Sequence, residues 1–111
     1  MDIQTSVTPY GRIIYLGGHL DAATAPEMEK DVAALITPEL PMIFDLSQVE
    51  YISSAGLRLF LIAFKQAARS RVPLVIASAI PTVQNIFNIS GFSRMIKCYT
   101  TNEEAFAALS R

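Results

Sequence analysis

Residues 44–58 read FDLSQVEYISSAGLR, and this stretch decides the fold that the sequence predicts. Its first residues end a short apolar run, Met42 to Leu46, which is typical of a central strand covered on at least one face. The polar segment from Ser47 to Tyr51 is expected to be a loop. Two serines then stand before the strongest predicted helix, which runs from about Ser54 to Arg69. A strand, a loop and a helix in this order favour an α/β fold.

Upstream of this stretch, the sequence predicts a hairpin and one helix. Strands are expected at residues 3–7 and 13–16, joined by a turn at 9–12, with a loop at 17–21 and a helix from 24 to 37. Thr24 is expected to cap that helix, because Glu27 follows it at capping-box spacing. Pro38 and Pro41 are expected to end the helix.

Downstream, helices and strands continue to alternate. Strands are expected at residues 72–77 and 95–99, and helices at 81–89 and 102–109, the last one capped by Thr101. The whole chain, residues 1–111, therefore predicts a single α/β domain. Its mixed sheet should have four to five strands, mostly parallel beyond the first hairpin, with about four helices.

Composition narrows the range of functions. The chain has 9 Lys and Arg against 10 Asp and Glu, a net charge of −1, which argues against nucleic acid as a partner. Its apolar runs are far shorter than the about 20 residues of a transmembrane helix, so no membrane insertion is expected. No signal peptide is evident, and one cysteine in 111 residues fits a reducing cytoplasm.

Residues that carry chemistry are few. His19, in a polar segment, is expected at the surface, and Cys98, in an apolar strand, is expected to be a small core residue. No metal-ligand spacing occurs, and Gly17-Gly18 lacks the remaining residues of a phosphate-binding loop. The sequence therefore predicts no catalytic residue, no metal, no cofactor and no enzyme activity.

The central helix divides into an apolar and a basic face. Its spacing predicts a core face made of Leu57, Phe60, Leu61, Phe64, Ala67 and Ala68. Arg58, Lys65 and Arg69 fall on the other side, within ~60° of Ser54. Ile62 stands at the edge of this basic stripe, where it is either a binding anchor or an ordinary surface residue.

The two serines allow two interpretations. Either Ser53 or Ser54 can be a helix cap whose hydroxyl accepts a free backbone N–H. The start of a helix also tolerates a phosphate, because its free N–H groups and dipole favour negative charge. A phosphate on Ser54 would add close to two negative charges to a surface without unfolding the chain.

Four segments together resemble the anti-sigma factor antagonists, which have the STAS fold. Residues 18–26 resemble the family's glycine-x-leucine-aspartate stretch, and residues 45–52 its aspartate-leucine-x-x-valine strand and loop. Residues 53–57 resemble its aspartate-serine-x-glycine-leucine switch, and residues 89–92 its late serine-glycine element. Their order and spacing match the family along nearly the whole chain.

The resemblance implies a mechanism. An antagonist of this family binds an anti-sigma factor that is often a serine kinase, and so frees a sigma factor for transcription. Phosphorylation of the switch serine ends the binding, and a serine phosphatase restores it. Alignment on Gly56 puts the phosphoacceptor at Ser54, although Ser53 replaces the usual acid and remains an alternative acceptor. The helix geometry and the resemblance together predict these partner-binding residues: Asp21, Ser53, Ala55, Gly56, Arg58, Ile62 and Lys65.

Other functions remain open from the sequence. The chain can be a STAS subunit of a transporter or sensory complex that needs no phosphorylation. A nucleotide-binding module around Asp21 and Ser54 is a third hypothesis, without phosphate-loop chemistry to support it. The first strand, at a sheet edge, also permits a homodimer.

Overall fold

Residues 3–37 and 40–109, which the computed structural model describes, form one five-stranded sheet with four α-helices and a short 3-10 helix. The elements in chain order are β1 (Ile3–Thr8), β2 (Gly11–Leu20), α1 (Ala25–Leu35), β3 (Met42–Ile52), α2 (Ser54–Arg69), β4 (Leu74–Ala77), α3 (Pro81–Ser90), η1 (Phe92–Arg94), β5 (Cys98–Tyr99) and α4 (Asn102–Leu109). The predicted α/β class and mixed sheet are confirmed. The predicted stop at Pro38 lies outside the described residues.

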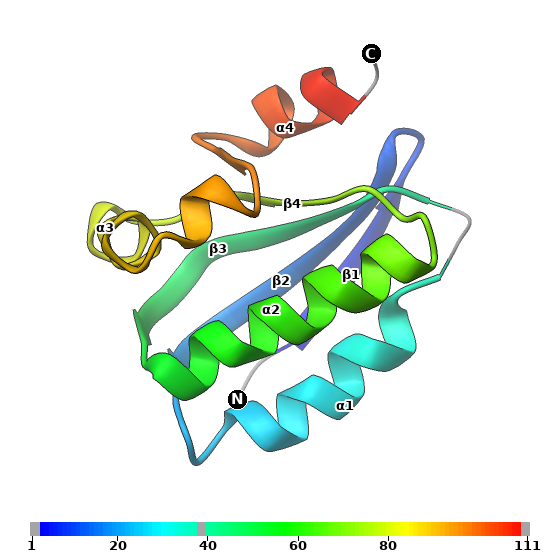
Figure 1. Ribbon diagram of the computed structural model, residues 1–111. Helices are drawn as coiled ribbons and strands as arrows, with labels where there is room; N and C mark the ends of the chain where they lie inside the picture. Colours follow the sequence, from blue (N-terminus) through cyan, green and yellow to red (C-terminus); the bar gives the residue numbers. More distant parts are fainter. Residues whose placement is uncertain (1–2, 38–39, 110–111) are drawn as a thin grey trace.

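The strands lie in sequence order, β1-β2-β3-β4-β5. β1 and β2 form the predicted antiparallel hairpin, and every later pair is parallel. Helices α1 and α2 lie side by side along one face of the sheet, and α4 lies above it in Figure 1. The resulting arrangement puts the long central strand β3 between helices on both sides.

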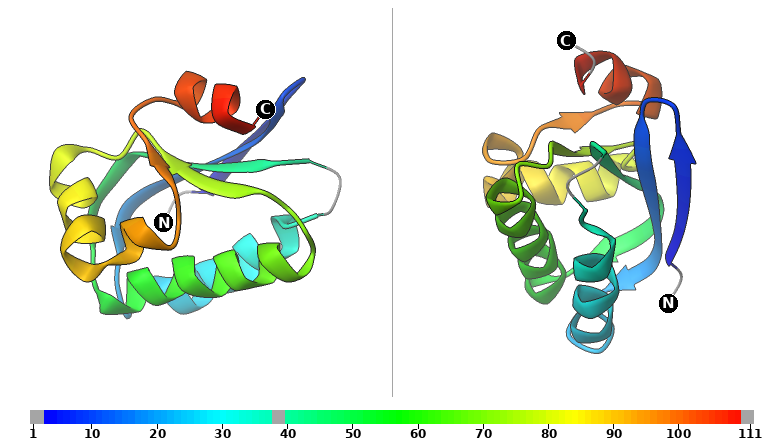
Figure 2. Two further views of the ribbon diagram at one scale, coloured as in Figure 1. Left: turned by 45° about the horizontal axis from the view of Figure 1, so that its top comes forward. Right: turned by 90° about the vertical axis from the view of Figure 1, so that its right-hand side faces the viewer.

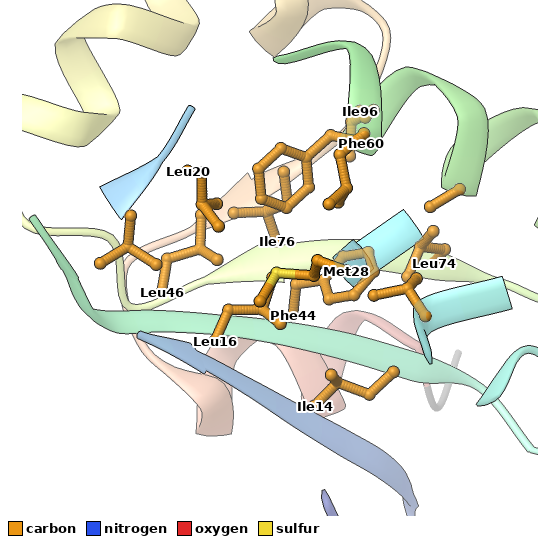
Figure 3. Close-up of a cluster of buried hydrophobic side chains, with 14 of the residues drawn as sticks. Ile14, Leu16, Leu20, Met28, Phe44, Leu46, Phe60, Leu74, Ile76 and Ile96 are labelled. Atoms are coloured by element: carbon orange, nitrogen blue, oxygen red, sulfur yellow. The ribbon is translucent and has the colours of Figure 1, made fainter. Parts of the chain in front are cut away.

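Most of the core lies between the sheet and α1, α2 and α3. Phe60 of α2 packs edge-to-face on Phe44 of β3 and on Phe87 of α3, with 5.4 Å between ring centroids in each pair. Figure 3 shows Phe44 and Phe60 among the aliphatic side chains of this cluster. A smaller cluster under α4 contains Ile43 and Ala105. The edge-to-face contacts of these three phenylalanines fix α2 against the centre of the sheet.

The predicted loops at residues 17–21 and 47–51 are largely wrong, because β2 and β3 continue through them. The parallel register changes twice: Tyr15 pairs with Asp45, Gly17 with Gln48, and His19 with Tyr51. β3 thus contains one extra residue at each of two bulges, which the sequence pattern reads as irregular chain. These bulges bring the ends of both strands, Leu20 and Ile52, to the same level.

The core face of α2 also differs from the prediction. Its buried residues are Gly56, Leu59, Phe60, Ala63 and Ala67, whereas Leu57, Leu61 and Phe64 are half-buried and Ala68 is exposed. The helix is therefore rotated by about a quarter turn from the predicted orientation. Apolar residues surround most of this helix, so periodicity alone does not select one buried side.

Side chains from two neighbouring elements complete the C-terminal end of α1. Arg12 Nη1 of β2 donates to the Leu35 carbonyl over 2.7 Å, and Gln66 Nε2 of α2 donates to the Ala33 carbonyl over 3.1 Å. These donors satisfy carbonyl oxygens that a helix end leaves free. They also hold α1 against both the sheet and α2.

Candidate functional site

The end of β2 and the start of α2 meet at the Leu20 carbonyl group. The Ser53 N–H donates to the Leu20 oxygen over 2.9 Å, and the Ser53 hydroxyl donates to the same oxygen over 3.3 Å. Gly56, one turn into α2, packs so closely on this carbonyl that a Cβ there would overlap its oxygen. Gly56 is therefore buried in the contact between α2 and β2. A direct contact with a partner would have to be made by the residues next to it.

Ser53 is the N-cap of α2. Its hydroxyl accepts the Gly56 N–H over 3.4 Å, and its backbone is extended, as expected of a cap. The interpretation of a serine as helix cap is thus confirmed for Ser53. Its hydroxyl is engaged with two backbone groups and is only partly exposed.

Ser54 is the first residue of α2, and it differs from Ser53 in its exposure and in its hydrogen bonding. It is exposed, and within residues 3–37 and 40–109 its hydroxyl has no hydrogen-bond partner. In the same part of the chain, the N–H groups of Ser54 and Ala55 have no acceptor. A free hydroxyl beside free N–H groups at a helix start is accessible to an enzyme and receptive to a phosphate.

Replacement of Ser53 by alanine tests its capping role. The Ser53→Ala chain should be about 1 kcal/mol less stable than the wild type, because the Gly56 N–H and the Leu20 carbonyl each lose a partner. Urea unfolding monitored by circular dichroism measures the change. Ser54→Ala is the matched control and should stay within about 0.5 kcal/mol, since its hydroxyl makes no internal bond. Equal stabilities of the two variants would contradict the assignment.

Asp21 organises the loop between β2 and α1. Its Oδ1 accepts the N–H groups of Ala23 over 2.9 Å and Thr24 over 3.2 Å. The Thr24 hydroxyl instead donates to the His19 carbonyl over 2.7 Å. Thr24 is the N-cap residue of α1 but makes no side-chain cap bond, so the predicted capping box is not formed. Asp21 shapes the loop next to Leu20 through these bonds.

A shallow hollow of about 370 Å³ lies between the first turns of α1 and α2. We call it the α1–α2 hollow. It is lined by Ala22, Ala25, Pro26, Glu29, Ala55 and Arg58. Small apolar side chains predominate, and one acidic and one basic group stand among them. Sequence reasoning placed Ala55 and Arg58 at the site but missed Ala22, Ala25, Pro26 and Glu29, since their position depends on how the two helices pack.

The basic stripe of α2 is present. Arg58, Lys65 and Arg69 are exposed, and none of them forms an ion pair within the described part of the chain. Arg58 lies one turn beyond Ser54, whereas Lys65 lies about 16 Å along the helix axis. Ile62 is only partly exposed. It shares a helix face with Gln66, which bonds to α1, so it points more toward α1 than into the stripe.

Two residues carry reactive side chains, His19 beside the loop at Asp21 and Cys98 on β5. His19 is exposed, as predicted, and its Nε2 lies 3.2 Å from Glu50 Oε2. Burial raises the pKa of the Cys98 thiol, partly offset by a hydrogen bond with Gln84, so the thiol is held in its less nucleophilic form. Cys98 is half-buried rather than fully in the core. Across residues 3–37 and 40–109, no three His, Cys, Asp or Glu side chains are grouped to bind a metal.

Comparison with known proteins identifies the family. A family model described as the STAS domain matches residues 2–105. The chain belongs to the STAS domain family. A Bordetella bronchiseptica protein named as an anti-sigma factor antagonist, BtrV, is 36% identical over 97 residues, covering 86% of this chain and 84% of its own. The resemblance seen in the sequence is thereby confirmed.

Solved structures share the fold of this STAS domain. The crystal structure of an anti-sigma factor antagonist from Mycobacterium paratuberculosis matches with a TM-score of 0.88 and 20% identity, over 99% of this chain and 94% of that one. The phosphorylated form of the Bacillus cell fate determinant SpoIIAA matches with a TM-score of 0.69 and 21% identity, over 97% and 99% of the two chains. In the described part of this STAS domain, no helix is long and apolar enough to cross a membrane.

Proposed function

We propose that this STAS domain is an anti-sigma factor antagonist, a cytoplasmic binding protein switched by phosphorylation of Ser54. The observation that carries the proposal is the contrast between two adjacent serines: the Ser53 hydroxyl caps α2, while the Ser54 hydroxyl is exposed and unbonded in the described residues. The family and the 36% identical relative support the class of partner, an anti-sigma factor. The chain acts by binding and not by catalysis.

The partner surface consists of the start of α2 and the α1–α2 hollow. The hollow is lined largely by alanines and Pro26, so it offers an apolar contact area, and Arg58 adds a charged group next to Ser54. Asp21 holds the adjoining loop, and Ile62 and Lys65 extend the surface along α2. Unmodified Ser54 stands beside this area as a small neutral side chain that a partner can cover.

Phosphorylation at Ser54 changes the surface and leaves the fold intact. The phosphate would lie beside the free N–H groups of Ser54 and Ala55, at the positive end of the helix dipole. Arg58 stands four residues later, the spacing at which an acidic and a basic group pair on a helix. The partner then meets close to two negative charges where it had contacted a neutral hydroxyl, and binding is lost through repulsion and desolvation.

A binding assay with an anti-sigma factor kinase tests the proposal. The unmodified chain should bind the kinase, and ATP should release it with one phosphate on Ser54, identified by mass spectrometry of tryptic peptides. A serine phosphatase should restore binding. A stable complex with transporter or sensory proteins that is unaffected by ATP would contradict this function and favour the phosphorylation-independent STAS subunit. Stabilisation by nucleotides without any protein partner would instead favour a nucleotide-binding module.

Arg58 gives a second, smaller effect on the same assay. The Arg58→Ala chain should bind the unmodified partner roughly three- to tenfold more weakly, because the variant removes an exposed charge next to the hollow. The loss should shrink as salt is raised. Lys97→Ala, an exposed basic residue far along the chain from α2, is the control and should bind as the wild type does. If both variants bind equally well, Arg58 is not part of the partner surface.

A further inference from the structure

Strand β1 is the outer edge of the sheet, and one of its two sides is unpaired. β1 pairs with β2 along its whole length, from Ile3 opposite Leu16 to Thr8 opposite Gly11. In the right-hand view of Figure 2, β1 is the outermost element on its side, and no helix lies beyond it. Alternate residues of an antiparallel edge strand direct their N–H and C=O groups away from the sheet. β1 therefore presents a row of free backbone donors and acceptors.

The two edges of the sheet differ in how they are protected. The opposite edge, β5, consists of Cys98 and Tyr99 only, and a short strand is a common protection against further pairing. β1 has six residues, IQTSVT, with no charged side chain and no proline, and its pairing with β2 shows no bulge. Val7 of β1 is 65% exposed. None of the usual features that prevent edge pairing is present in β1.

The sequence of β1 is also complementary to itself. When two antiparallel copies are centred on Thr5, each Ile3 faces Val7 of the other copy, and each Gln4 faces Ser6. Apolar side chains then pair with apolar ones on one face, and polar with polar on the other. No like charges are brought together. This two-fold pattern fits a second copy of the same chain.

We propose that two copies of this STAS domain associate through β1, in antiparallel register centred on Thr5, so that their sheets form one ten-stranded sheet. The association is isologous, because the same strand is used on both sides of a two-fold axis. Six residues a side form a small contact, below the about 1,200 Å² of stable complexes, so the dimer is concentration-dependent. The start of α2 takes no part in this contact, and each dimer therefore presents two Ser54 sites.

Cysteine cross-linking tests the register. In a Cys98→Ala background, Thr5→Cys places two thiols opposite each other at the axis, with Cβ atoms about 5 Å apart. Val7→Cys is the matched control, because its two copies would be separated by four residues along the strand, about 14 Å. Mild oxidation should give a covalent dimer at least about tenfold faster with Thr5→Cys. Equal rates, or a faster reaction of Val7→Cys, would overturn the register and the proposal.

Analytical ultracentrifugation of the full chain tests the association itself. The wild type should pass from monomer to dimer as its concentration rises into the high micromolar range, and a monomer at every concentration up to about 1 mM would overturn the proposal. Thr5→Lys, which opposes two charges at the axis, should weaken dimerisation roughly fivefold or more, whereas Thr5→Val should retain it. Circular dichroism verifies that both variants are folded. Dimerisation unaffected by Thr5→Lys would contradict the proposal.

The dimer is independent of the proposed partner. All of these measurements use the isolated chain without kinase or ATP, so failure of the anti-sigma function leaves their result unchanged. Ser54→Ala should dimerise as the wild type does, because Ser54 lies at the start of α2 and not on β1. Loss of partner binding with intact dimerisation, or the reverse, separates the two proposals.

Discussion

A chain with Ser54→Asp should bind an anti-sigma factor about a hundredfold more weakly than the wild type while unfolding at the same urea concentration. The side chain is exposed, and its hydroxyl has no partner in the described residues, so the fold loses nothing. An acidic residue at the first position of α2 also faces favourable helix charge. The partner, however, would have to cover a carboxylate next to the α1–α2 hollow, where it had contacted a neutral hydroxyl. Isothermal titration calorimetry with the unmodified partner measures the effect.

Three variants separate the effect of charge on partner binding from the effects of side-chain size and position. Ser54→Asn has nearly the same size as the aspartate without its charge, and it should retain most of the affinity. Ser53→Asp carries the same charge one residue earlier. Its carboxylate would accept the Gly56 N–H as Ser53 does, but it cannot donate to the Leu20 carbonyl, so circular dichroism must first verify that the variant is folded. It should bind within about threefold of the wild type. Ser54→Ala should bind fully and remain bound when ATP is added.

The switch assignment depends on two of these results. If Ser54→Ala is still phosphorylated and released by ATP, the phosphoacceptor is another residue, and Ser53 is the first to examine. If Ser54→Asp binds as tightly as Ser54→Asn, negative charge at this position does not control binding. Either result would contradict the proposed mechanism without affecting the family assignment.

The Gly56→Ala chain should be destabilised by about 2–3 kcal/mol, although the change adds only one methyl group. The new Cβ would overlap the Leu20 carbonyl oxygen and lie 2.9 Å from Ile52 Cγ2. A backbone carbonyl is not free to move aside, so α2 would have to shift away from the end of β2. The helix-propensity gain of roughly 1 kcal/mol for alanine over glycine offsets only part of this cost.

Urea unfolding of Gly56→Ala against Ala68→Ser measures the effect. Ala68 is exposed on the same helix, and its substitution should change stability by less than about 0.5 kcal/mol. Partner binding by the folded fraction of Gly56→Ala should also fall, because displacement of α2 moves Ser54 relative to the loop at Asp21. Wild-type stability of Gly56→Ala would show that α2 does not pack on Leu20 as described.

Local patterns predicted the order of the elements well. The alternation in residues 3–7, the apolar run at 42–46 and the hydroxyl caps of α2 and α4 depend on contacts within a few residues. The Thr101 hydroxyl, for example, accepts the Glu104 N–H over 3.1 Å, as expected of a cap. The parallel pairing that extends β2 through Gly17 and Gly18 depends on a strand more than 20 residues away, and this is why it was predicted as a loop.

The site was predicted in part for the same reason. Sequence spacing placed Arg58 on the side of α2 that carries Ser54, since both belong to one helix. It did not decide which of Ser53 and Ser54 caps the helix. The difference between them depends on the Leu20 carbonyl, which only tertiary structure brings within reach of Ser53. Leu59 was missed as a core residue because Leu57 and Leu61 lie on an equally apolar arc of the helix.

The Leu20 carbonyl, which accepts two donors from Ser53 and lies against Gly56, also bears on how quickly such a switch responds. These contacts join the end of β2 to the start of α2, and the Ser54 hydroxyl takes no part in them. In the proposed mechanism, phosphorylation of Ser54 therefore switches binding without breaking the contacts of the Leu20 carbonyl. In that mechanism, the response time is set by the turnover of the kinase and phosphatase that modify Ser54, and not by a rearrangement of the chain.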